Sequence, residues 1–96
     1  MITRIVKMTF DLEGEDKFPG IFLGVQHKIK SFPGCIDVRL MQDHQRNNVY
    51  FTISTWESHQ DLENYRQSDL FAVTWTRVKK YFVEKAEAWS LEEINP

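Results

Sequence analysis

The stretch from Val49 to Phe71 constrains the fold most, because its side-chain pattern changes from period two to a helical period. Residues 49–56 (VYFTISTW) alternate as in a strand, whose successive side chains point to opposite faces. One face carries Val49, Phe51 and Ile53. The other, here called the hydroxylated row, carries Tyr50, Thr52, Ser54 and Trp56. Large aromatic rings at both ends with small hydroxyls between them suit the wall of a pocket for an aromatic or polycyclic ligand.

The remaining strands are predicted from the same alternation, and the first helix from a longer period. Strands are expected over residues 2–10, 35–42 and 86–91. Apolar residues recur from Phe18 to Ile29 at helical spacing, which predicts an amphipathic helix with Pro19 in its first turn. The acidic segment 11–17 is expected to be a loop. Two glycines, at positions 20 and 24, are expected to let this helix approach the sheet or a ligand closely.

Two serines mark the starts of further helices after residue 56. Ser58 is followed three residues later by Asp61, and Ser68 precedes a run with Phe71 and Trp75 at helical spacing. The predicted order is β-α-β-β-α-α-β. This order is an α+β, ferredoxin-like arrangement with a four-stranded antiparallel sheet and its second helix broken in two.

The composition limits the classes of partner. Ninety-six residues predict one domain over residues 1–96, and the net charge of -2 comes from 12 basic and 14 acidic residues that are well mixed. Nucleic acid is not expected as a partner, because phosphate binding needs a basic face. No apolar run approaches the roughly 20 residues that span a bilayer. The N-terminus resembles a strand and not a signal peptide, so a cytoplasmic location and no membrane association are expected.

The sequence predicts no metal site and no internal disulfide. Cys35 is the single cysteine, and we expect a buried structural thiol. The histidines at positions 27, 44 and 59 lack the spacing of a metal site, so surface histidines are expected.

Helices on one side would leave the opposite face of the sheet uncovered. Both rows of the second and third strands carry apolar or aromatic residues, so neither face suits water. Because an open apolar face usually marks an interface, the sequence predicts a homodimer in which two sheets meet.

Two motifs resemble the antibiotic-biosynthesis monooxygenase superfamily. One is Phe32-Pro33-Gly34-Cys35 at the start of the second strand. The other is Trp56-Glu57-Ser58 followed by Leu62, Tyr65, Ser68 and Phe71. The resemblance implies a dimeric α/β barrel, with a ligand cleft between the helices and the sheet of each protomer. The superfamily includes cofactor-independent monooxygenases, haem-degrading monooxygenases, isomerase-like members and proteins with no known activity.

The same resemblance disfavours haem degradation and implies no cofactor. That branch pairs an asparagine, a tryptophan and an iron-binding histidine. The tryptophan corresponds to Trp56, but the histidine position is Trp75 here, and the asparagine position falls at about Val6.

The resulting hypothesis is a cofactor-independent monooxygenase that acts on a small aromatic hydroxy compound or quinol. As catalytic residues we expect Trp56 to stack on the ligand, Thr52 to hydrogen-bond a phenolate and Tyr65 to donate a phenolic proton into the cleft. The expected ligand-binding residues are Tyr50, Ser54, Phe71 and Trp75. The alternative is a non-catalytic dimeric barrel that binds a small hydrophobic molecule.

Overall fold

A computed structural model describes residues 1–95. The elements in this range are β1 (Ile2–Thr9), α1 (Leu12–Lys30), β2 (Cys35–Gln42), β3 (Val49–Trp56), α2 (His59–Arg66), α3 (Asp69–Lys79) and β4 (Glu87–Leu91). This order confirms the predicted ferredoxin-like arrangement.

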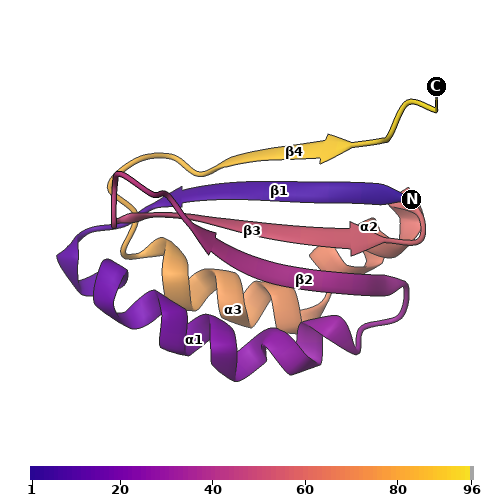
Figure 1. Cartoon of the computed structure of the whole chain (residues 1–96). Coiled ribbons are helices and arrows are strands. Elements are labelled where there is room, and N and C mark those ends of the chain that lie inside the picture. Colours follow the sequence, from indigo (N-terminus) through magenta and orange to yellow (C-terminus); the bar gives the residue numbers. More distant parts are fainter. Residues whose placement is uncertain (96) are drawn as a thin grey trace.

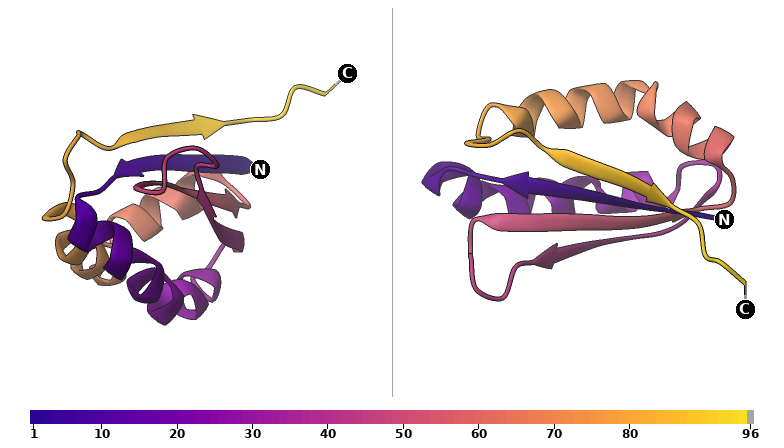
Figure 2. Two further views of the ribbon diagram at one scale, coloured as in Figure 1. Left: turned by 60° about the vertical axis from the view of Figure 1, so that its left-hand side comes forward. Right: turned by 90° about the horizontal axis from the view of Figure 1, so that it is seen from above.

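The strands form one antiparallel sheet in the order β2-β3-β1-β4, with β1 between β3 and β4. Figures 1 and 2 show the helices on one side of this sheet and no element across the other side within the described residues. In register, Ile5 of β1 lies between Ile53 of β3 and Trp89 of β4. These three side chains therefore share the open face, and their neighbours in sequence point toward the helices.

The core lies between the sheet and the helices, and the hydroxylated row of β3 faces it. Tyr50, Ser54 and Trp56 are buried there. Phe51 alternates with them and lies half-buried on the open face, beside Lys7 and Met41. The described sheet therefore has one well-packed face and one apolar face that nothing covers in the protomer.

The first helix begins six residues earlier than its apolar spacing predicts. Asp11 caps α1, because its Oδ1 atom accepts a hydrogen bond of 2.7 Å from the backbone N–H of Gly14. The segment predicted to be a loop is thus the first two turns of the helix, and Pro19 lies inside the helix, not in its first turn. The prediction was wrong because the acidic first turns carry few apolar residues, although acidic residues favour a helix start.

Close packing of α1 depends on a different glycine from those that the sequence indicates. Apart from its chain neighbours and the backbone of the same helix, nothing lies within 4 Å of a Cβ at Gly20 or Gly24, which are exposed. A Cβ at the buried Gly14 would meet Tyr81 and Phe10 too closely. The close approach therefore occurs at the start of α1, against the turn that follows α3.

The conformation and packing of the turn before β2 explain why the Pro-Gly motif has a glycine there. Gly34 has φ of 85°, a left-handed conformation that side chains other than glycine rarely adopt. A Cβ at Gly34 would also collide with the side chain of Asp61 in α2. The carbonyl of Gly34 accepts a 2.8 Å hydrogen bond from the N–H of Glu57, and this bond connects the turn to the end of β3.

Candidate functional site

A cavity of about 360 Å³ lies between the sheet and the helices. Its floor is the helix-facing side of the sheet, and α1, α2 and α3 provide the other walls. The lining residues are Arg4, Val6, Met8, Phe18, Phe22, Ile29, Val38, Thr52, Ser54, Leu62, Tyr65, Arg66, Phe71, Thr74, Trp75, Val78, Ala86 and Ala88. The lining is mostly apolar, as in most small-molecule sites.

The middle of the hydroxylated row reaches the cavity. Thr52 and Ser54 line it from β3, and the paired residues Val6 and Arg4 line it from β1. The small side chain of Ala88 in β4 borders it beyond β1. The two hydroxyls therefore form a short polar strip in an apolar wall.

Aromatic rings from α2 and α3 form the opposite wall. Tyr65, Phe71 and Trp75 all line the cavity. The rings of Phe71 and Trp75 are stacked at 5.6 Å and 13°, and Phe71 meets Tyr65 edge to face at 5.4 Å. These three rings present apolar surfaces on which a flat ligand can pack.

Trp56 is not among the lining residues. Its side chain is fully buried, its Nε1 atom donates a 3.0 Å hydrogen bond to Ser54 Oγ, and its ring stacks on Tyr65 at 5.0 Å. Because Ser54 accepts this bond, its own O–H is left to donate. Trp56 therefore lies behind the wall and orients two residues that do line the cavity.

Tyr50 is also absent from the lining. Its hydroxyl donates a 3.2 Å hydrogen bond to the carbonyl of Glu15 in α1, and it accepts one of 3.1 Å from Gln42. The Glu15 carbonyl is the group that Pro19, four residues later and without an N–H, cannot bond. Tyr50 thus supplies a hydrogen bond that the helix itself cannot make.

Burial raises the pKa of Tyr65 to about 12, with a smaller contribution from the negative charge that Cys35 carries when it is ionised. The hydroxyl therefore stays protonated at neutral pH. Tyr65 can donate a hydrogen bond to a ligand, but it cannot accept a proton as a base.

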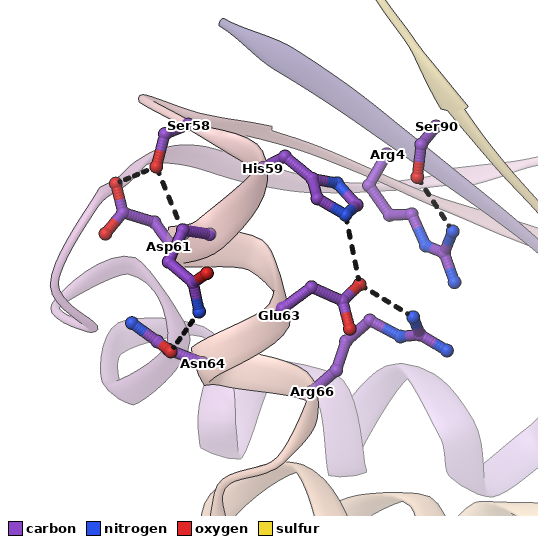
Figure 3. Close-up of polar contacts among 9 residues, drawn as sticks. Arg4, Ser58, His59, Asp61, Glu63, Asn64, Arg66 and Ser90 are labelled. Carbon is purple, nitrogen blue, oxygen red and sulfur yellow. Dashed lines mark hydrogen bonds and ion pairs between the residues drawn. The ribbon is translucent and has the colours of Figure 1, made fainter.

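The sequence interpretation missed two arginines at the cavity. Arg4 reaches it from β1, and its Nη1 atom donates a 2.9 Å hydrogen bond to Ser90 Oγ of β4. Arg66 reaches it from the last turn of α2 and bonds Glu63 Oε1 at 2.9 Å (Figure 3). One signal was visible in the sequence, because Arg4 interrupts the apolar row of the first strand.

The lining contains no other charged side chain. None of the lining residues carries a carboxylate, an imidazole or a thiol. Across residues 1–95, no group of three or more histidine, cysteine, aspartate or glutamate side chains could hold a metal ion. The chemistry of the cavity thus rests on hydroxyls, guanidinium groups and aromatic rings.

The fold and the cavity define a small α+β domain that encloses an apolar, aromatic-lined ligand site. The sequence profile described as antibiotic biosynthesis monooxygenase matches residues 1–76. The chain belongs to the antibiotic biosynthesis monooxygenase family. No curated protein sequence matches it.

Solved structures of low identity share this fold. An antibiotic biosynthesis monooxygenase superposes with a TM-score of 0.91 at 14% identity, covering 99% of this chain and 100% of that one. A conserved protein from Methanosarcina mazei Go1 gives 0.89 at 17% identity, with coverages of 98% and 94%. A variant of SnoaB, a cofactor-independent oxygenase from Streptomyces nogalater, gives 0.85 at 16% identity, with coverages of 99% and 94%. At these identities the likeness shows the fold alone.

No helix in the described part of the chain combines the length and the apolar character that crossing a membrane requires.

Proposed function

We propose that this protein is a cofactor-independent monooxygenase that oxidises a small aromatic hydroxy compound or quinol in the cavity. The observation that carries the proposal is an apolar cavity of about 360 Å³ with an aromatic wall, a hydroxyl strip and cationic groups. Membership of the monooxygenase family supports it. Among the similar structures, the cofactor-independent oxygenase SnoaB has the same fold.

In this reaction the ionised substrate itself supplies electrons to O2. For a phenol that becomes a quinone, one oxygen atom enters the ring. The other leaves as water with the ring hydrogen and the hydroxyl hydrogen. The protein supplies a site that excludes water, and it holds the substrate and O2 together.

The polar side chains stabilise the ionised substrate. Thr52, Ser54 and Tyr65 donate hydrogen bonds to its oxygen atoms, which favours the anion over the neutral phenol. Phe71 and Trp75 pack against its ring. Trp56 acts as a positioning residue, because it holds Ser54 and Tyr65 from behind the wall.

Oxygen uptake with a panel of hydroquinones and dihydroxynaphthalenes tests this proposal. Uptake should exceed the uncatalysed rate and should fall at least tenfold, about 1.4 kcal/mol, in Thr52→Val. Thr55→Val is the matched control, since Thr55 lies on the same strand but on the open face of the sheet. Uptake at the uncatalysed rate with every compound would overturn the proposal.

A non-catalytic binding protein is the second candidate. It is favoured by one observation, the lack of any carboxylate or imidazole base in the lining. Background oxygen uptake, combined with quenching of tryptophan fluorescence by the same panel, would support this candidate.

We also propose that the working form is a homodimer joined through the open face of the sheet. That face carries Ile5, Phe51 and Ile53 at its centre, and Trp89 and Leu91 on β4. Trp89 and Leu91 are 43% and 47% exposed in the protomer. Members of this family are typically dimeric, which supports a second copy as the partner.

A further inference from the structure

Arg4 is an unusual residue for the floor of an apolar cavity. It lies on β1 between apolar neighbours of the same face, Ile2 and Val6, and its side chain is half-buried. Burial is the main cause that lowers the pKa of its guanidinium, followed by the positive charge of Arg66, and the negative charge of Glu63 only partly opposes them. A charge that is partly withdrawn from water gains from a charged partner, because desolvation is costly.

The charges around Arg4 do not balance. Within residues 1–95 no carboxylate lies within 4 Å of Arg4, and its hydrogen-bonding partner is the neutral hydroxyl of Ser90. The nearest acid on α2, Glu63, is engaged by Arg66 at 2.9 Å and is 3.9 Å from His59. Figure 3 shows these groups converging from β1, β4 and α2. Two guanidinium groups and one carboxylate leave a single positive charge beside the cavity.

We propose that Arg4 and Arg66 bind the carboxylate of an aromatic carboxylic acid whose ring occupies the cavity. This inference deepens the proposed function, since it concerns the same cavity and names the class of its substrate. One uncompensated positive charge matches a monoanion. A guanidinium has five N–H donors in a planar fork, and the bond to Ser90 uses one of Arg4's.

The strand register places the ring of such a ligand. Arg4 pairs with Ser54, and Thr52 lies two residues further along β3. That step moves about 7 Å along the sheet. A carboxylate held at Arg4 therefore directs the ring toward Val6 and Thr52, under the aromatic wall of α2 and α3. Arg66 is partly exposed, so the carboxylate end lies at the mouth of the cavity.

Calorimetric titration with naphthoate and naphthamide tests the proposal. The two probes have nearly the same shape, and one carries a carboxylate where the other carries a neutral amide. Naphthoate should bind at least tenfold more tightly at low salt. Equal affinity of the two probes for the wild-type protein would overturn the proposal, and this result needs no variant to fold.

Variants test whether Arg4 and Arg66 cause the preference for naphthoate over naphthamide. Arg4→Gln and Arg66→Gln should each reduce the affinity ratio at least threefold, mainly by weakening naphthoate, while naphthamide changes little. Arg46→Gln, in the exposed hairpin between β2 and β3, is the matched control and should keep the ratio.

Circular dichroism identifies a variant that fails to fold, and Arg4→Lys then replaces Arg4→Gln. Arg4→Lys should keep a reduced preference. An unchanged ratio in both folded cavity variants would contradict the assignment.

The titration with these two probes tests the anion site separately from the monooxygenase proposal. Neither probe is a hydroquinone, so their binding reports on the anion site alone. Tight naphthoate binding without oxygen uptake on any substrate would support the anion site and contradict the monooxygenase proposal. Equal affinities of the two probes with oxygen uptake above the uncatalysed rate would contradict the anion site and support the monooxygenase proposal.

Discussion

Tyr50 shows how one hydroxyl can compensate for a proline within a helix. Pro19 removes the N–H that would bond the Glu15 carbonyl, and the Tyr50 hydroxyl lies 3.2 Å from that oxygen. Tyr50→Phe should therefore lower the free energy of unfolding by about 1 kcal/mol. Urea unfolding monitored by circular dichroism measures the change.

A double-mutant cycle tests the cause of that change. Pro19→Ala restores the backbone bond to Glu15, so Tyr50→Phe should cost clearly less in the Pro19→Ala background than in the wild type. The same cost in both backgrounds would show that the hydroxyl does not compensate for the proline.

Tyr65 should make stability fall at high pH. Its ordinary pKa of 10 rises to about 12 in the folded protein. Between these values the unfolded chain loses the proton and the folded chain keeps it, so the stabilisation is complete below pH 10 and is lost as the pH rises toward 12. The free energy of unfolding should decline by up to about 1.4 kcal/mol per pH unit in this window.

Tyr65→Phe isolates this effect from the other groups that ionise at high pH. Urea unfolding of both proteins at about pH 8 and about pH 11 gives the difference that belongs to Tyr65. The gap between wild type and variant should narrow as the pH rises. A constant gap would mean that Tyr65 ionises alike in both states.

At the scale of elements, the turn before β2 is fixed by one glycine. Gly34→Ala must adopt a positive φ and must displace Asp61. It should lower the free energy of unfolding by at least about 1–2 kcal/mol. Gly20→Ala is the matched control, because the added methyl group meets nothing and the helix gains up to about 1 kcal/mol. Denaturant midpoints measure both, and a neutral Gly34→Ala would contradict this explanation of the motif.

The sequence predicted most elements because their signals are local. Alternation located the strands, and both serine caps are confirmed, with Ser58 Oγ accepting from Asp61 N at 3.1 Å and Ser68 Oγ from Phe71 N at 3.2 Å. The start of α1 was missed because its cap, Asp11, precedes acidic turns that carry few apolar residues.

The candidate site was predicted only in part. Alternation specifies which face of the sheet a side chain is on, but not whether that side chain reaches the cavity. Thr52 and Ser54 belong to the right face and reach the cavity. Trp56 belongs to the same face, yet the rings of Phe32 and Tyr65 cover it at the end of the strand. The role of Arg4 depends on α2, which is distant in sequence and brings Arg66 and Glu63 beside it. No local sequence pattern predicts that these residues of α2 lie beside Arg4.

At the scale of the whole molecule, the open face of the sheet predicts the assembly. The wild-type protein should elute at twice the protomer mass in size-exclusion chromatography with light scattering. Phe51→Glu combined with Trp89→Glu should give a monomer, because it places charges at the centre of the proposed interface. Val73→Glu is the control, since Val73 is 62% exposed on α3, away from that face. A monomeric wild type at micromolar concentration would contradict the proposed dimer.

The position of β4 has a consequence for how the cavity responds to a ligand. All five residues of β4 are exposed, and it pairs with β1 alone in the described chain (Figure 1). In a protomer that is not joined to a partner, a strand of this kind opens by local fluctuation far more often than the core unfolds. Each opening separates Ser90 from Arg4, so the guanidinium loses its orientation. An anion bound to Arg4 would oppose that opening, and the backbone amides of β4 would then exchange their hydrogens more slowly when the cavity is occupied.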